Sequence, residues 1–323
     1  MIYDKWKNLT QDIKIIRKEA KSFGYAYGAK RLALRLVPYK IRSKSKACRA
    51  LEYRAVMTYL EKYLPVIREY DSRESKETIG ASSNIWLFWW QGYENAPDIV
   101  KACVASVRKN AGAHPVVLLD QYNYKEYVTL PDDIVHKFEK GNMMIAHFSD
   151  IIRTALIYQY GGIWIDATIY MRHPLDEVIE NSSFYSLHHW EEKAEPSKLV
   201  FGLWTTFFLG CGKGNYIAGL LNKLLLEYWK QEETVIHYFL MDYFITMIYW
   251  NVEDAKRTID NIAVSNRDIH ELIGILNERK DKLKQLQDDG TYLYKLTHKM
   301  DFSDSVDGEE TIYHMLVHEG WVN

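Results

Sequence analysis

The N-terminal quarter of the chain carries apolar residues at helical spacing. One stripe with steps of three and four residues consists of Trp6, Leu9, Ile13, Ile16, Ala20 and Phe23. Such steps are typical of an amphipathic helix. A further helical pattern runs from about residue 48 to residue 68, and a polar segment, residues 69–80, follows it. We therefore expect a helical N-terminal extension over residues 1–78 and a second domain over residues 79–323.

Beyond residue 84, short apolar runs alternate with helical patterns. Strand-like runs occupy residues 85–90, 115–119 and 163–171, with a further strand-like stretch near residues 182–190. The helical patterns lie at residues 97–110, 133–143, 147–160, 216–231, 237–251, about 268–286, and near 308–321. Strands that alternate with helices predict an α/β fold, with a mostly parallel sheet flanked by helices.

Charge is distributed unevenly along this pattern. The whole chain has a net charge of -2, but residues 1–80 hold 19 Lys or Arg and 9 Asp or Glu. Between Glu19 and Glu52 there are nine basic residues and no acidic one. This asymmetry indicates a polyanionic partner, either an anionic membrane surface or nucleic acid. The chain lacks a recognisable basic–aromatic nucleic-acid module, so nucleic acid is not expected.

Cysteine content and hydropathy bear on location. Three cysteines, Cys48, Cys103 and Cys211, lie far apart, without the spacing of a disulfide framework or a metal site. The longest wholly apolar run is residues 85–90, far short of the roughly 20 residues of a membrane span. We therefore expect a cytoplasmic protein that does not cross the bilayer. Aromatic residues make up 14% of the chain. They can serve either in core packing or as stacking surfaces for sugars and bases.

One stretch combines several groups that can carry chemistry. In "SDIIRTALIYQYGGIWIDAT" a helix ends at Gly161-Gly162, and a strand then leads to Asp166. Ligands of open α/β sheets bind at the carboxyl ends of strands, where Asp166 is expected. Asp150 and Arg153 lie three residues apart, so both can face one site. A strand-end aspartate that only caps a loop is an equally good interpretation of the spacing alone.

The same stretch resembles a known signature. "FSDIIRTALIYQYGGIWIDATIY" is similar to the central motif of the bacterial capsular polysaccharide synthesis glycosyltransferases. They group with DXD-bearing sugar transferases, the family-32-like enzymes, which include glucosylating toxins and yeast initiating mannosyltransferases. "NIWLFWWQGYENAPDIVKACVASVRKNAG", "HYFLMDYF" and "YKLTHK" resemble further motifs, so the similarity covers roughly residues 80–300. It implies a GT-A-like, Rossmann-type fold and a nucleotide-diphosphate sugar donor, most simply a UDP-sugar.

The resemblance also implies roles for individual residues. Trp89 or Trp90, followed by Gln91, would stack on the nucleobase, and Asp150 with Arg153 would contact the ribose and the donor sugar. Lys299 and His298 would lie near the diphosphate, and a divalent metal, Mn²⁺ or Mg²⁺, would be held by Asp166 and His298. The expected donor-binding set is Trp89, Trp90, Gln91, Asp150, Arg153, Gly161, Gly162, Asp166, Thr168 and Lys299. The expected catalytic set is Asp166, Asp150, Arg153 and Asp242.

Three features leave alternatives open. Thr168 stands where a full DXD motif has a second acid, and "DAT" resembles the form of that family; a hydroxyl is a poorer ligand for a hard cation. Asp242 faces the acceptor hydroxyl in one interpretation and is an ordinary helix acid in the other. His314 and His318 share a helix face at i, i+4, a spacing that can hold a metal, but the sequence shows no accompanying acid motif.

These observations predict a glycosyltransferase that is peripheral on the inner face of the cell membrane. It would move a hexose from a UDP-sugar to a lipid-linked or free glycan in surface polysaccharide synthesis. Related families mostly retain the anomeric configuration, so retention is expected. The main alternative is a catalytically degenerate transferase fold that serves as a scaffold or a glycan-binding subunit.

Overall fold

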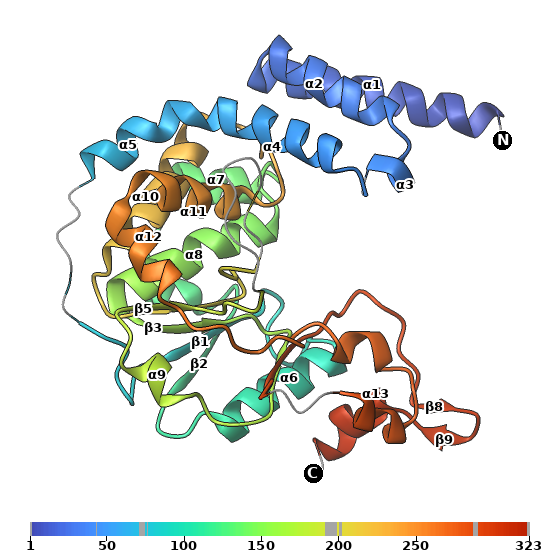
Figure 1. Ribbon diagram of the computed structural model, residues 1–323, viewed down its shortest axis with the longest axis vertical. Helices are drawn as coiled ribbons and strands as arrows, with labels where there is room; N and C mark the ends of the chain where they lie inside the picture. The colour runs from blue at the N-terminus through green and yellow to red at the C-terminus, as the bar shows by residue number, and fades with distance from the viewer. Residues whose placement is uncertain are drawn as a thin grey trace.

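A computed structural model describes residues 2–42, 44–70, 75, 77–190, 199, 202–286 and 290–321. Its centre is a five-stranded sheet with the order β2-β1-β3-β6-β5 (Figure 1). The strands are β1 (Ile85–Phe88), β2 (Val116–Leu119), β3 (Gly162–Ile165), β5 (Phe184–Ser186) and β6 (Phe208–Cys211). β1 pairs in parallel with β2 and β3, whereas β6 pairs antiparallel with β3 and β5. Within this sheet β6 therefore runs against the other four strands, which confirms the predicted mostly parallel α/β architecture.

Helices cover both faces of the sheet (Figure 1). Every residue of β1 and β3 is buried, which explains their continuous apolar runs. In Figure 1, α8 and α10 lie over one face and α6 lies on the opposite side. The helices of this region are α6 (Asp98–Asn110), α7 (Asp132–Glu139), α8 (Ile145–Tyr160), α9 (Glu177–Glu180), α10 (Tyr216–Gln231), α11 (Leu240–Asn251) and α12 (Glu253–Asp260), with a 3₁₀ turn at Tyr124–Glu126.

The N-terminal region is helical, and its later helices pack on the α/β body. Its elements are α1 (Ile2–Phe23), α2 (Tyr25–Leu36), α3 (Tyr39–Arg42), α4 (Lys46–Leu60), a 3₁₀ turn (Glu61–Tyr63) and α5 (Leu64–Glu69). The ring of Tyr63 lies 5.8 Å from that of Tyr228 and 5.7 Å from that of Phe244. The buried carboxylate of Glu232 accepts hydrogen bonds from Tyr59 at 2.7 Å and Tyr63 at 3.2 Å. These helices thus share one hydrophobic core with the sheet domain.

At least one of the basic N-terminal residues forms ion pairs within this helical region. Arg31 pairs with Glu52 at 2.5 Å and with Glu19 at 3.4 Å. Among the described residues, the structure contains no helix that is both long and apolar enough to span a membrane.

The C-terminal region differs from the sequence prediction. Instead of one helix over residues 268–286, it forms turns and two short 3₁₀ helices, Leu272–Ile275 and Lys280–Gln285. The apolar side chains of Ile269, Leu272 and Leu276 are buried at steps of three and four, which produced the helical pattern. However, the carbonyl oxygens of Ile269 and Leu276 accept hydrogen bonds from the backbone of distant segments. Tertiary pairing therefore replaces the i to i+4 ladder of a helix.

Two small antiparallel pairs complete the fold. β4 (Ile169–Met171) pairs with β7 (Leu293–Lys295), and β8 (Ser305–Val306) pairs with β9 (Glu309–Glu310). The chain then forms α13 (Ile312–His314) and a π-helical turn (Met315–Glu319), which agrees with the helix expected near the C-terminus.

Candidate active site

A cleft of about 750 Å³ opens at the carboxyl ends of β1 and β3. Its walls come from the segments that follow these strands, from α8, from the start of α11 and from the chain after β7. Ten of the sequence-predicted residues line it: Trp89, Trp90, Gln91, Asp150, Arg153, Asp166, Thr168, Asp242, His298 and Lys299. The fold therefore brings together side chains that are up to 210 positions apart in the sequence.

Asp166 is the centre of the polar network in this cleft. Its Oδ1 accepts hydrogen bonds from Trp164 Nε1 at 2.9 Å and from Arg153 Nη2 at 3.2 Å. Its Oδ2 accepts one from Lys295 Nζ at 2.7 Å. Burial alone would raise the pKa of Asp166, but Lys295 and Arg153 outweigh it and hold that pKa below the usual value. Asp166 is thus a fixed carboxylate between two cations.

Lys295 is a charged residue of the cleft that the sequence analysis missed. β7 pairs with β4 so that Lys295 lies opposite Ile169, three residues after Asp166. Its Nζ also donates to Thr168 Oγ1 at 2.8 Å. The hydroxyl of Thr168 is therefore an acceptor for this lysine. Lys295 is the second residue of the quoted "YKLTHK", and this was the available signal.

Arg153 is held from several directions. It lies one helical turn after Asp150 on α8, and its Nη2 is 3.5 Å from Asp150 Oδ1. Its Nη1 donates to the carbonyl oxygen of Thr206, and its guanidinium carbon lies 4.9 Å from the centre of the Trp164 ring. Only 6% of Arg153 is exposed. A buried guanidinium with these partners has one fixed orientation toward the cleft.

The two candidate tryptophans have different surroundings. Trp90 belongs to an aromatic cluster, with ring centres 4.9 Å from Phe138 and 5.9 Å from Phe148. Trp89 instead meets the ring of His298 edge-on at 5.0 Å. Both side chains line the cleft, but Trp90 also packs within the aromatic cluster, whereas Trp89 contacts His298 of the opposite segment.

Asp242 lies in the first turn of α11 and is 9% exposed. Burial, aided by the negative charge of Asp150 and opposed by Arg153, raises the pKa of Asp242 to about 7. Two carboxyl groups of the cleft are thus shifted in opposite directions: the pKa of Asp166 is lowered by its two cations, and the pKa of Asp242 is raised toward neutrality. Such a separation of two carboxyl pKa values is typical of sites that handle protons.

The expected metal pair, Asp166 and His298, does not fit a resident divalent ion. Both oxygens of Asp166 are already engaged by Lys295, Arg153 and Trp164. Hard divalent ions prefer about six oxygen ligands. Among the described residues, the groups of three or more His, Cys, Asp or Glu side chains that could share an ion lie in the C-terminal region and do not include Asp166. The cleft instead supplies positive charge from its own side chains, Lys295, Arg153 and Lys299.

Gly161 and Gly162 lie at the opposite end of β3 from Asp166 and do not line the cleft. Both have positive φ, 71° and 98°. A Cβ on Gly162 would come within 2.3 Å of the carbonyl oxygen of Asn84. Their role here is the tight turn from α8 into β3, so they are removed from the candidate donor site.

The fold and cleft define an α/β protein with a charged ligand site at the carboxyl ends of its strands. A family model described as capsular polysaccharide synthesis protein matches residues 38–316. The chain belongs to this family, as its resemblance predicted. The narrower family-32-like, DXD-type assignment stays a prediction.

Several named proteins are similar to parts of the chain. O-glycosyltransferase PaGT of Phomopsis amygdali is 24% identical over 192 residues, 52% of this chain and 44% of that protein. Glycosyltransferase afumC of Aspergillus fumigatus is 26% identical over 187 residues, 54% of this chain and 43% of that protein. The chain spans less than half the length of these relatives. The solved PaToxG glycosyltransferase has a TM-score of 0.39 and 12% identity, over 65% of this chain and 84% of that one.

Proposed function

We propose that this protein is a glycosyltransferase that moves a hexose from a nucleotide-diphosphate sugar, a UDP-sugar, to a glycan acceptor. The observation that carries the proposal is the fixed group of Asp166, Lys295 and Arg153 at the end of β3. The names of the similar proteins and the family membership support the reaction class.

The cleft has the features that a nucleoside diphosphate needs. Its volume of about 750 Å³ lies within the usual range for small-molecule sites. In the proposed complex, Trp89 stacks on the uracil and Asp150 accepts hydrogen bonds from the ribose. The diphosphate lies near Lys295, Lys299 and Arg153, which together offset its negative charge.

The chemistry follows from where charge develops. The bond between the anomeric carbon and the β-phosphate oxygen breaks, and UDP leaves with the electron pair. The acceptor oxygen forms the new bond on the same face of the sugar, and its proton passes to the departing phosphate, so configuration is retained. Lys295 and Arg153 stabilise the negative charge of the leaving group, and a preorganised contact of this kind contributes about 3–4 kcal/mol.

Asp242 is assigned to the acceptor. Its position at the start of α11 places it on the cleft wall with Asp150 and Arg153. In its ionised form it would accept a hydrogen bond from an acceptor hydroxyl and orient that hydroxyl toward the anomeric carbon. Its pKa of about 7 means that this form becomes populated as the pH rises through neutrality.

The N-terminal helices would dock the enzyme on an anionic membrane surface, where a lipid-linked acceptor is found. Around α3, two apolar side chains are largely exposed, Leu36 at 69% and Ile41 at 60%. Exposed basic residues lie beside them, namely Lys40, Lys44 and Lys46. Apolar contacts surrounded by lysines suit an anionic bilayer, and each lysine contributes about 1 kcal/mol.

Vesicle flotation tests this docking. The wild type should float with vesicles rich in phosphatidylglycerol and stay unbound with neutral phosphatidylcholine vesicles. The variant with Lys40, Lys44 and Lys46 changed to Glu should lose more than about 100-fold in affinity, because three attractive charges become repulsive ones. Equal flotation of this variant would contradict the assignment of the surface.

Calorimetric titration of UDP tests the donor site. The wild type should bind UDP without Mn²⁺, because the cleft carries its own cations. Lys295→Met should weaken binding at least ten-fold, whereas Lys230→Met, an exposed lysine on α10, should not. Binding that requires Mn²⁺ would overturn the metal-free donor site. UDP binding without turnover of any UDP-sugar would favour the scaffold or glycan-binding alternative.

A further inference from the structure

The C-terminal hairpin brings an acid next to two histidines that the sequence alone left without one. The turn between β8 and β9 consists of Asp307 and Gly308, with φ of 51° and 82°. Two-residue Asp-Gly turns of this kind suit the twist of antiparallel strands. The register pairs Ser305 with Glu310, and the backbone N–H of Thr311 donates to the carbonyl oxygen of Asp304 at 3.1 Å. Asp304 is thereby fixed beside the start of α13.

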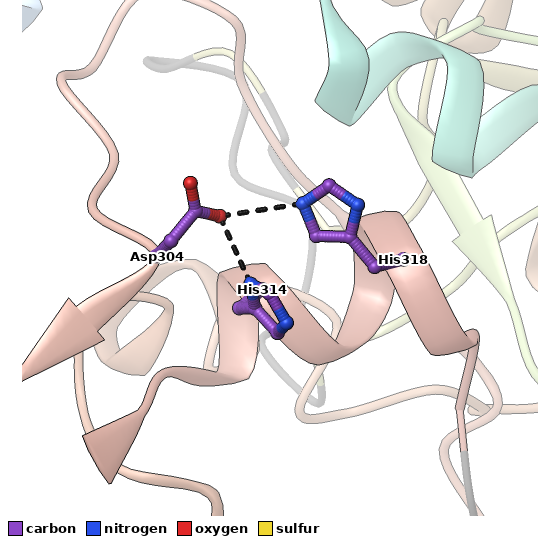
Figure 2. Close-up of side chains that lie close together, drawn as sticks. All are labelled: Asp304, His314 and His318. Carbon is purple, nitrogen blue, oxygen red and sulfur yellow. Dashed lines mark hydrogen bonds and ion pairs between the residues drawn. The ribbon is translucent and has the colours of Figure 1, made fainter.

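Thr311 also positions the start of the helix that follows. Thr311 caps α13, because its Oγ1 accepts from the backbone N–H of His314 at 3.1 Å. The chain then passes into the π-helical turn Met315–Glu319, a rare conformation that is frequent at functional sites. The rings of His314 and His318 lie with their centres 4.4 Å apart. Figure 2 shows both imidazoles facing the carboxylate of Asp304.

The two distances from Asp304 to the histidines match those between ligand atoms around a tetrahedral ion. Asp304 Oδ1 lies 3.2 Å from His314 Nδ1 and 3.5 Å from His318 Nε2. The three ligand atoms lie within 4.8 Å of one another. Zinc binds imidazole nitrogen and carboxylate oxygen at about 2.0–2.2 Å, which separates tetrahedral ligand atoms by about 3.3–3.5 Å. We propose that Asp304, His314 and His318 form a Zn²⁺ site that lies outside the cleft.

A neighbouring carboxylate prepares His314 for this role. Glu310 Oε1 lies 3.5 Å from His314 Nε2, on the far side of the ring from Asp304. A proton on Nε2 would face Glu310 and leave the lone pair of Nδ1 toward the ion. Histidine ligands commonly donate their second N–H to a carboxylate in this way, and loss of that partner lowers metal affinity 10–100-fold.

A second group nearby, Glu310, His314 and Glu319, does not carry the proposal. The ammonium group of Lys280 lies between its two carboxylates, 2.5 Å from Glu310 and 2.7 Å from Glu319. That group already holds a cation. Within the described part of the chain, the ion pairs of Asp304 are both with imidazoles, so its carboxylate has no ammonium or guanidinium partner to displace.

The chemistry of the ligands selects the ion. Two imidazoles and one carboxylate suit Zn²⁺ rather than Mg²⁺ or Ca²⁺, which prefer oxygen ligands. The side chains of Asp304 and His318 are 62% and 52% exposed, so water can complete the shell. The ion would join the hairpin to the C-terminal helix. Its ligand Asp304 lies five residues after Lys299 of the cleft wall.

Calorimetric titration of Zn²⁺ into the chelator-treated full chain tests the site. The wild type should bind one Zn²⁺ tightly. His318→Ala and Asp304→Asn should each weaken this binding at least ten-fold, and Glu310→Gln should weaken it 10–100-fold. Both ligand changes are at exposed side chains, so the fold should persist, which circular dichroism checks. His136→Ala, an exposed histidine on α7, should leave binding unchanged.

Two further measurements make the outcome decisive. Asp166→Asn should retain the Zn²⁺ affinity, which separates this site from the cleft. Co²⁺ in place of Zn²⁺ should give the visible absorption of a tetrahedral complex in the wild type and lose it in His318→Ala. Zn²⁺ affinity that is the same in wild type, Asp304→Asn and His318→Ala would overturn the proposal. The absence of Zn²⁺ binding would also overturn it and leave only an ion pair between Asp304 and the histidines.

Discussion

Replacement of Asp242 by asparagine tests whether the ionised Asp242 carboxylate destabilises the folded protein. The carboxyl group is 9% exposed, and its pKa is raised from 3.8 to about 7 by burial first and by Asp150 second. A gap of about three pH units corresponds to about 4 kcal/mol, at 1.36 kcal/mol per unit. This is the destabilisation that ionised Asp242 imposes on the folded protein above neutral pH.

The sign follows from proton linkage. Below pH 4 the carboxyl is protonated in both states and contributes no pH dependence. Between about pH 4 and pH 7 the unfolded chain has released the proton while the folded protein retains it, so the free energy of unfolding falls as pH rises. Above pH 7 both states are ionised and the loss levels off. Asp242→Asn removes this dependence. The free energy of unfolding of the variant, minus that of the wild type, should therefore increase by up to about 4 kcal/mol from pH 4 to pH 8.

Urea unfolding of both proteins at intervals from pH 4 to pH 8.5 measures this difference, because contributions of distant groups cancel between them. Asp133→Asn, at an exposed carboxylate of α7, controls for the change in net charge. Asp150→Asn should reduce the pKa shift of Asp242, since the charge of Asp150 raises it. A stability difference between wild type and Asp242→Asn that stays flat across this range would refute the reasoning.

Three further predictions concern activity and binding. Wild-type kcat/KM should rise with pH through about 7, and Asp242→Asn should lose that rise in a pH–rate profile. Lys295→Met should lower kcat about 100-fold or more in a UDP-sugar transfer assay, since it removes a cation beside the leaving group; loss of less than ten-fold would argue against this contact. Trp89→Ala should weaken UDP binding by about 1–3 kcal/mol, whereas Trp90→Ala should lower the melting temperature instead; the reverse result would exchange their roles.

The α/β class was predictable because its signals are local. Residues 85–88 and 162–165 are buried on both faces of the sheet, so continuous apolar runs marked them as strands. The helical patterns of α6, α8 and α10 were also local signals, because each could be recognised within its own segment. The segment 268–286 was wrongly predicted as one helix, because burial of Ile269, Leu272 and Leu276 repeats at helical steps although the backbone pairs elsewhere.

The candidate site was partly predictable from one continuous stretch. Asp150, Arg153 and Asp166 lie within 17 residues, and a helix–turn–strand unit places them at one edge of the sheet. The role of Thr168 could not be assigned, because its partner Lys295 arrives from 127 positions away through the β4–β7 pairing. Gly161 and Gly162 were assigned to the donor site because they lie within the quoted motif, although the length of β3 separates them from Asp166.

The sequence by itself determined the α/β class, the helical and basic N-terminus, and the carboxylate at the strand end. Each depends on composition or on periodicity within one element. Only the tertiary structure decided that Asp166 faces two cations, that Asp242 is buried enough for its pKa to approach 7, and that Asp304 meets His314 and His318. These properties depend on strand register and on burial by distant segments, which local patterns do not encode.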